Sequence, residues 1–407
     1  MATAVLKKNL NLNDLIIYFI AFFLAFWCLG RSIPFIGQGY FTVGILLLFY
    51  FSPLLFIGKK FYLNHPWLMF SFVGAHFLIV NYAHKNLYTF DFLFHLFFAF
   101  LFFFFLINFI GRFDQLEKFV FVLILSLSII TAYLIIMHLF VFKSLYLTPH
   151  LTYDEWWNLS KGRKNTLSFF LALMFPFAFS YFVQKKSLFS VFIFFTLGFG
   201  TIYTISRTSL ISFFLTLFLA CYFSLNRKKF IKYVLVILFC LSVFRAVTGF
   251  GFNSFMKLKY VTEQEHQLID RGEKKFVEFQ GHRFVLLTEA LKGFVNKPLF
   301  GNGVSTFRGQ EKTMGSMTHN DYAQILYEMG LTGFILFIAL FFVSFRDLWR
   351  SRSHVPKEFS WLWEGQTVAL VNMFALLFFT NAYETVPFWL VMSCCQILPR
   401  LARQQVS

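Results

Sequence analysis

Hydrophobic runs long enough to cross a membrane follow one another along almost the whole chain. A transmembrane helix needs about 20 consecutive, mostly apolar residues, and the sequence contains twelve candidate runs. They cover residues 14–30, 39–57, 66–83, 88–111, 118–142, 166–184, 187–205, 209–225, 230–248, 323–345, 365–382 and 385–399. Hydrophobic residues make up 58% of the 407 residues, which is more apolar surface than a soluble domain of this size could bury. The sequence therefore predicts an all-α, polytopic membrane protein with about 12 transmembrane helices and a single integral membrane domain over residues 1–407.

The formal net charge of +17 is spread over small basic clusters between the hydrophobic runs. With the N-terminus inside, every second connection is basic: Lys7-Lys8, Lys59-Lys60, Arg112 with Lys118, Lys185-Lys186, residues 227–229, residues 346–357, and Arg400 with Arg403. This distribution follows the positive-inside rule and is typical of contact with anionic membrane lipids. It predicts that both termini are cytoplasmic, and it does not favour a nucleic-acid partner, for which the sequence has no motif. The basic connection at 143–165 is an exception on the outer side.

One long polar interruption, from residue 248 to residue 321, separates the ninth run from the tenth. Long loops are exempt from the charge rule, so we expect residues 248–321 to form a large periplasmic loop between transmembrane helices 9 and 10. Apolar residues at helical spacing predict a helix over residues 283–296. Its apolar stripe consists of Phe284, Leu287, Leu291, Phe294 and Val295. Such a helix would lie along the membrane interface, with Arg283 at its start and Pro298 beyond its end. Arg283 could equally be a surface arginine that reaches for lipid headgroups.

The loop ends in His319-Asn320-Asp321, which leads into a run with helical periodicity. Asn320 or Asp321 could simply cap that helix, because both residue types favour the N-cap position. A histidine at such an entry point, just above the membrane, can also accept a proton from a hydroxyl group near neutral pH. A helix cap and a catalytic base therefore both stay open on spacing alone.

A second candidate site residue is Arg207, in the short connection between the seventh and eighth runs on the same outer side. The connection is so short that the guanidinium group must lie at the membrane boundary, where an unpaired charge is costly. Arg207 is therefore expected to meet an anion, either a lipid phosphate or a substrate pyrophosphate. Arg163 and Lys164, before the sixth run, add positive charge on the same face.

Four motifs stand out between residues 160 and 335. They are Asn165 opening a run that contains Pro176, Ser206-Arg207-Thr208-Ser209, Arg283 followed by a Gly-rich turn at 298–307, and His319-Asn320-Asp321-Tyr322 followed by residues 328–333. Together they resemble the O-antigen ligase/polymerase superfamily of bacterial cell-envelope glycosyltransferases, most closely the O-antigen ligases. Outside this region the resemblance rests on topology alone, and the motifs discriminate poorly among members of the superfamily.

The resemblance implies a GT-C-type, inverting, metal-independent glycosyltransferase of lipopolysaccharide biosynthesis that uses no cofactor, and the sequence has no Asp-x-Asp metal motif. Its donor would be a glycan linked to undecaprenyl diphosphate and its acceptor lipid A–core, at the periplasmic face of the bacterial inner membrane. By position, Arg207 and Arg283 match the arginines thought to hold the donor diphosphate, and His319 matches the proposed general base. We expect Asn320, Arg163 and Lys164 to contact the substrate as well.

Three other functions stay open. An O-antigen polymerase would use the same donor with a second lipid-linked glycan as acceptor, and a protein O-oligosaccharyltransferase usually carries a larger C-terminal soluble region. A lipid-linked glycan flippase should place charged residues along a central cavity in several spans. Scattered candidates for such a cavity are Asp91, His95, His138 and Arg245, whereas the richest polar cluster lies outside the runs.

Overall fold

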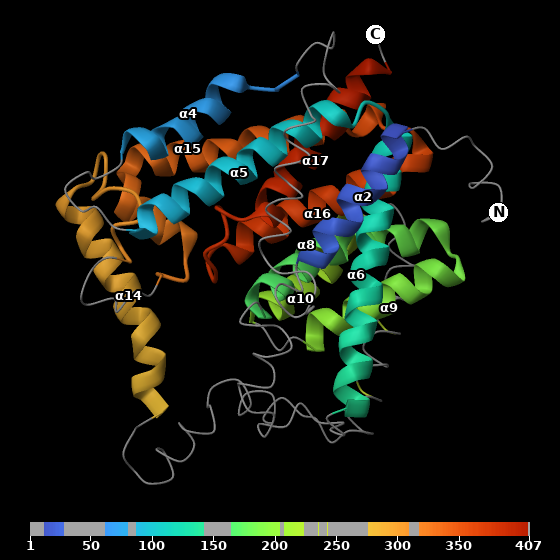
Figure 1. Cartoon of the computed structure of the whole chain (residues 1–407), viewed down its shortest axis with the longest axis horizontal. Coiled ribbons are helices and arrows are strands. Elements are labelled where there is room, and N and C mark those ends of the chain that lie inside the picture. Colours follow the sequence, from blue (N-terminus) through green and yellow to red (C-terminus); the bar gives the residue numbers. More distant parts are fainter. Residues whose placement is uncertain are drawn as a thin grey trace.

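The computed structural model describes residues 12–27, 62–79, 87–141, 164–203, 207–223, 235, 242, 276–308 and 317–405. Within these ranges every regular element is a helix and there is no strand (Figure 1), which confirms the predicted all-α fold. The elements are α2 (Leu12–Trp27), α4 (Pro66–Leu78), α5 (Leu87–Phe109), α6 (Phe113–Val141), α8 (Lys164–Lys185), α9 (Leu188–Tyr203), α10 (Arg207–Phe223), α14 (Phe276–Asn296), α15 (Asp321–Ser351), the short 3₁₀ turns η3 (Arg352–His354) and η4 (Lys357–Phe359), α16 (Ser360–Leu376) and α17 (Val386–Gln404).

Four of the described helices are long and apolar enough to cross a membrane, judged by length and composition. The qualifying stretches are Phe92–Phe109, Phe113–Ile136, Leu167–Lys185 and Asp321–His354, while Leu188–Ile202 and Ser209–Leu219 are apolar but shorter. The predicted run at 39–57 and nearly all of that at 230–248 lie outside the described residues, and each of the other runs coincides with a described helix. A total of about twelve spans accordingly stays a prediction.

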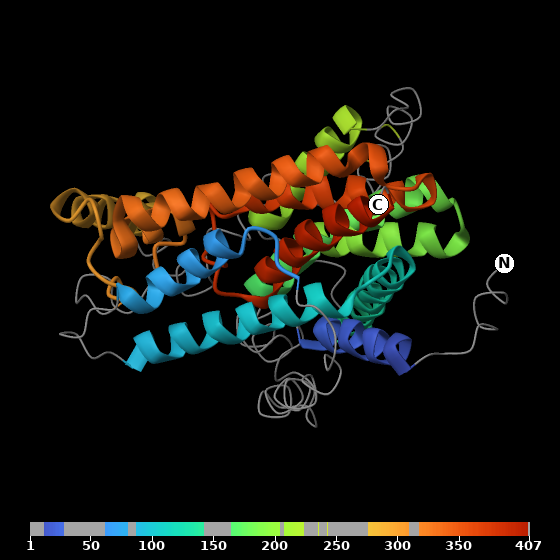
Figure 2. The same ribbon diagram turned by 90° about the horizontal axis from the view of Figure 1, so that it is seen from above.

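The helices form two packed groups that meet where α16 contacts α15 and α17 and where α8 contacts α17 (Figures 1 and 2). In one group α15 packs against α4 and α17, and α5 packs against α17; in the other, α8 packs against α9, α10 and α16. Buried aromatic rings fill the first group, where the ring of Phe337 stacks with those of Phe72 and Phe388 at centroid distances of 5.6 and 6.1 Å. This packing fixes α15 and α17 side by side, so polar groups at their ends come together.

A buried polar joint holds α10 to its neighbours. The Nδ2 group of Asn372 on α16 donates to Ser212 Oγ at 2.8 Å and to Thr216 Oγ1 at 2.7 Å, both on α10. The hydroxyl of Ser212 in turn donates to the carbonyl of Ala172 on α8 at 2.7 Å. Hydrogen bonds between helices in an apolar surrounding oppose sliding or rotation of one helix against another, because the polar groups could not form replacement bonds with water. The joint therefore fixes the position of α10, whose first residue is Arg207.

The helix α15 is broken at Gly330, which has a φ of 64° and a ψ of −159°. The break leaves backbone N–H and C=O groups without partners inside the helix. Backbone groups of the Gly-rich turn at 298–307 form hydrogen bonds with them. Gly303 N–H donates to Glu328 O at 2.9 Å, Leu331 N–H to Pro298 O at 2.7 Å, and Thr332 N–H to Leu299 O at 3.2 Å. The turn and the break thus form one hydrogen-bonded unit, although 33 positions separate Leu299 from Thr332.

The helix α14 ends at Asn296, as the position of Pro298 predicts, but its predicted start is wrong. It begins at Phe276, so Arg283 lies inside the helix and not at its start. The residues before Arg283 include Gly281 and His282, which are weak helix formers. The apolar periodicity also does not extend into this part, so the sequence did not predict a helix there.

The face of α14 that packs on α15 overlaps the predicted stripe only at its edge, where Leu287 packs against the cluster of Leu286, Ala290 and Tyr327. Leu286 and Ala290 are buried, and at Gly293 an added Cβ would lie 2.1 Å from the ring of Tyr327 on α15. On the predicted stripe, by contrast, Phe284 and Val295 are each 71% exposed. An exposed apolar stripe of this kind is consistent with a helix that lies along a membrane interface.

Candidate functional site

The His319 segment sits at the entrance to α15. Asn320 is the N-cap of that helix, and its Oδ1 atom accepts a hydrogen bond from Ala323 N–H at 3.0 Å. The capping interpretation of Asn320 is thereby confirmed. The cap occupies the side-chain oxygen, which leaves the amide Nδ2 for other contacts.

His319 has a left-handed backbone with a φ of 54° and is half-buried. A non-glycine residue in this conformation stores about 1–3 kcal/mol of strain and persists only where its surroundings hold it, which is frequent at functional sites. Here the hydroxyl of Thr318 donates to Asn320 O at 2.8 Å and accepts from Asn320 N–H at 3.2 Å. These bonds join the residues on either side of His319 and so fix its backbone and the direction of its Cα–Cβ bond.

Asp321 clamps this segment to the connection between α16 and α17. Its Oδ2 atom accepts from the N–H groups of Ala382 and Tyr383 at 2.8 and 3.1 Å. Asn381 Nδ2 donates to Asp321 Oδ1 at 3.1 Å and to Thr318 Oγ1 at 3.2 Å. The carboxylate is fully buried, and multiple N–H donors are what a buried carboxylate requires. Asp321 therefore anchors the segment that carries His319 to residues 381–383.

Replacing Asp321 by asparagine is expected to lower the free energy of unfolding by about 1–3 kcal/mol, because an NH₂ group would face the N–H donors that the carboxylate now accepts. Any activity that depends on His319 should fall as well, since the His319 segment loses its anchor. Thermal unfolding of the purified protein measures the first effect and an activity assay the second. The matched control is Asp114→Asn, because Asp114 is an exposed carboxylate paired with Arg112 at 3.1 Å. Equal unfolding midpoints for the two variants would contradict the clamp.

Glu328 is a second buried acid on α15, and no motif in the sequence predicted a role for it. Gln324 Nε2 lies 3.4 Å from its Oε1 atom, and the N–H of Ser305 also donates to the carboxylate. Arg308 and Glu384 lie close enough for their charges to act on it. The signal that could have found Glu328 is its spacing: it follows Asp321 by seven residues, so both lie on one helix face, and an acid on a buried face is rare.

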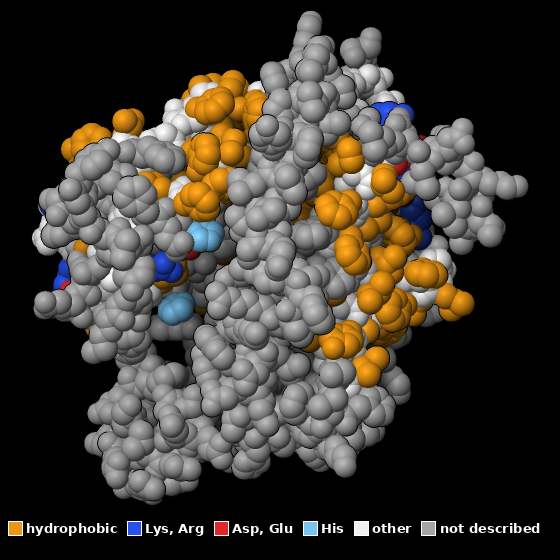
Figure 3. All heavy atoms as spheres, in the orientation of Figure 1, with side chains coloured by type: hydrophobic (Ala, Val, Ile, Leu, Met, Phe, Trp, Pro, Cys, Tyr) orange, Lys and Arg blue, Asp and Glu red, His pale blue; other side chains and the backbone are white. Residues whose placement is uncertain are grey.

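The candidate site residues other than His319 and Asn320 are placed only by their backbones or not at all. Arg207 is the first residue of α10, Lys164 is the first residue of α8, and Arg283 lies within α14, whereas their side chains and all of Arg163 lie outside the described part. The N-terminus of α10 carries the positive end of the helix dipole, which adds to the charge of Arg207 and favours an anion. On the face shown in Figure 3, Lys or Arg and His side chains gather around a hollow beside α14.

A family model described as O-antigen ligase matches residues 192–338. This match supports an O-antigen ligase/polymerase family protein. The matched stretch runs from α9 to the middle of α15. It contains Arg207, Arg283, His319 and the break at Gly330. No curated protein matches the chain. That family consists of membrane glycosyltransferase-like enzymes.

Proposed function

We propose that this protein is an O-antigen ligase, which transfers a glycan from undecaprenyl diphosphate to lipid A–core. The observation that carries the proposal is His319, held in a left-handed backbone by the Asp321 clamp within the stretch that matches the O-antigen ligase family. A histidine fixed in this way, at the end of the membrane-spanning part of α15, suits a base that meets a sugar hydroxyl group at the membrane surface.

In the proposed reaction, a hydroxyl oxygen of the acceptor sugar attacks the anomeric carbon of the donor glycan. The bond between that carbon and the diphosphate oxygen breaks, the anomeric configuration inverts, and His319 takes the hydroxyl proton. Negative charge builds on the departing diphosphate, where Arg207 and Arg283 would offer bidentate contacts. Loss of one such donor typically costs about 10²–10³-fold in rate. Arg163, Lys164 and the amide Nδ2 of Asn320 would hold the substrate.

We further propose that the His319 site faces the periplasm of a bacterial inner membrane, that residues 248–321 form the periplasmic loop, and that both termini are cytoplasmic. The distribution of charge along α15 and α17 supports this orientation. His319 lies at the N-terminal ends of these helices, whereas Arg346, Arg400 and Arg403 lie at their C-terminal ends. Basic residues favour the cytoplasmic side.

A lipopolysaccharide gel of a strain that lacks this gene tests the proposed function. A ligase predicts loss of the whole long-chain ladder, with polymer accumulating on the lipid carrier because it has no route to lipid A–core. If the ladder were instead replaced by lipid A–core that carries a single repeat unit, the protein would be a polymerase and the proposal would be overturned. Complementation with the wild-type gene is the control.

A further inference from the structure

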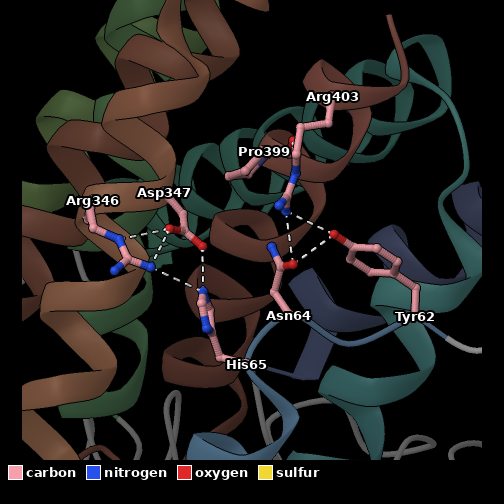
Figure 4. Close-up of polar contacts among 7 residues, drawn as sticks. All are labelled: Tyr62, Asn64, His65, Arg346, Asp347, Pro399 and Arg403. Atoms are coloured by element: carbon pink, nitrogen blue, oxygen red, sulfur yellow. Dashed lines mark hydrogen bonds and ion pairs between the residues drawn. The ribbon is translucent and has the colours of Figure 1, made fainter. Parts of the chain in front are cut away.

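A polar cluster lies at the far ends of α15 and α17, away from the His319 site. We call it the C-terminal cluster; it consists of Tyr62, Asn64, His65, Arg346, Asp347, Arg400 and Arg403, and Figure 4 shows all of these except Arg400. Sixteen residues of α15 separate Gly330 from Arg346, which corresponds to roughly 24 Å along a helix axis. The two sites therefore lie near opposite surfaces of the membrane-spanning part.

In one half of the cluster the negative charge of Asp347 neutralises the positive charge of Arg346. Arg346 Nε and Nη2 donate to Asp347 Oδ1 at 3.1 and 3.0 Å. His65 Nε2 lies 2.8 Å from Asp347 Oδ2 and 3.4 Å from Arg346 Nη2 (Figure 4). The single carboxylate of the cluster is thus shared between Arg346 and His65.

In the other half the partners of Arg403 within the described residues are all neutral. Its Nη2 atom donates to Tyr62 OH at 2.9 Å and to Asn64 Oδ1 at 2.8 Å, and its Nε donates to Pro399 O at 3.3 Å (Figure 4). Burial raises the pKa of the Tyr62 hydroxyl, although Arg403 and Arg400 partly oppose the shift. The hydroxyl therefore keeps its proton at neutral pH and donates it to Asn64 Oδ1 at 2.8 Å.

Arg400 also has no acidic partner among the residues that the structure describes, and it is only 6% exposed. Its Nη1 donates to Ile107 O at 2.6 Å, its Nη2 donates to Ile110 O, and its guanidinium carbon lies 5.1 Å from the centre of the Tyr62 ring. Carbonyl groups and a ring face stabilise a cation, but they do not neutralise it. A buried guanidinium without a counter-ion is costly.

Among the buried side-chain atoms of this cluster, those without a hydrogen-bond partner in the described part of the chain are Asn64 Nδ2 and Arg400 Nε, and both are donors. The cluster also contains three guanidinium groups and one carboxylate. What it lacks is a negatively charged group with several acceptor oxygens. Arg403 is exposed and the side chain of Arg346 is 37% exposed, so both can be reached from outside. Guanidinium forks match phosphate oxygens in geometry.

We propose that the C-terminal cluster binds the phosphate of an anionic lipid headgroup, in the leaflet opposite the His319 site. The helix surfaces beside it favour a lipid over free phosphate. Trp67 and Phe70 on α4 are 65% and 55% exposed, and Phe342 on α15 is 67% exposed. These side chains offer an apolar surface for acyl chains next to the arginines, and a tryptophan at this depth is typical of a membrane interface.

The test compares the effects of three probes on the thermal unfolding of the purified full-length chain in detergent: dioleoyl-phosphatidylglycerol, dioleoyl-phosphatidylcholine and inorganic phosphate. Phosphatidylglycerol should raise the unfolding midpoint, and the other two should not. Arg403→Gln is expected to weaken the apparent affinity for phosphatidylglycerol about tenfold or more, because a charge-assisted hydrogen bond is lost. The matched control is Arg350→Gln, an exposed arginine one turn further along α15 and outside the cluster.

Equal loss in the two variants, or no loss in Arg403→Gln, would overturn the site. An equal shift with inorganic phosphate would overturn the lipid as its ligand. Native mass spectrometry of the folded fraction, which counts bound phosphatidylglycerol molecules directly, gives a second readout if Arg403→Gln folds poorly. In that experiment Arg403→Lys keeps the charge but not the planar fork. It should retain part of the binding if the cluster is an anion site, and full binding in Arg403→Gln would again overturn it.

Discussion

Replacing His319 by alanine is expected to slow glycan transfer by about 10²–10⁴-fold, the range that a positioned general base contributes. The proton of the acceptor hydroxyl then has no receiving group in the site, while the two proposed arginines still bind the donor. The protein should remain in the membrane, because the hydrogen bonds of Thr318, Asn320 and Asp321 hold this segment without the imidazole ring. Transfer is measured in membranes with a lipid-linked donor and lipid A–core, and the amount of protein by immunoblot.

Two further variants sharpen this result. His319→Asn removes the base but suits a left-handed backbone, so it separates the loss of chemistry from any loss of local structure. His354→Ala changes an exposed histidine of η3 at the other end of α15 and should transfer at the normal rate. If His319→Asn kept more than about a tenth of the wild-type rate, His319 would not be the base.

Replacing Gly330 by alanine is expected to destabilise the protein by about 2–6 kcal/mol. The backbone at Gly330 has a conformation that L-residues rarely adopt. In addition, a Cβ atom there would lie 2.6 Å from the backbone carbonyl carbon and oxygen of Leu299. Backbone atoms of a hydrogen-bonded turn cannot move aside as a flexible side chain can. Because the total stability of a folded domain is about 5–15 kcal/mol, the yield of folded protein should drop sharply together with its unfolding midpoint.

Gly74→Ala is the matched control for this prediction. Gly74 lies in α4, and no atom lies within 4 Å of the Cβ that alanine would add there. Alanine favours a helix over glycine by about 1 kcal/mol, so this variant should be at least as stable as the wild type. Equal unfolding midpoints for Gly330→Ala and Gly74→Ala would show that the break in α15 is not needed.

Features that depend on local sequence were predictable, and those that depend on distant partners were not. Apolar runs marked the helices, Pro298 marked the end of α14, and Asn320 carried the chemistry of an N-cap. The break at Gly330, however, lies inside an apolar stretch that predicts one uninterrupted span over residues 323–345, and the groups that stabilise the break come from residues 298–303.

The same limit applies to the candidate site. The position of His319 before a helix was visible in the sequence, but the strain at that residue was not. The N–H groups of Ala382 and Tyr383 that donate to Asp321 are 61 and 62 positions away in the sequence. No local sequence pattern predicts these contacts. Glu328 could not be predicted because an acid on a helix is usually solvated, whereas here tertiary packing buries it.

The hydrogen bonds between the Gly-rich turn and the broken helix also decide which piece of this protein can be exchanged as a module. A chimera that took only the outer loop from another protein would keep these bonds only if the new turn placed its backbone groups where Pro298, Leu299 and Gly303 place theirs. A graft that carried residues 298–333 together would bring both halves of that pairing. The loop and the first turns of the following helix are therefore best exchanged as one unit.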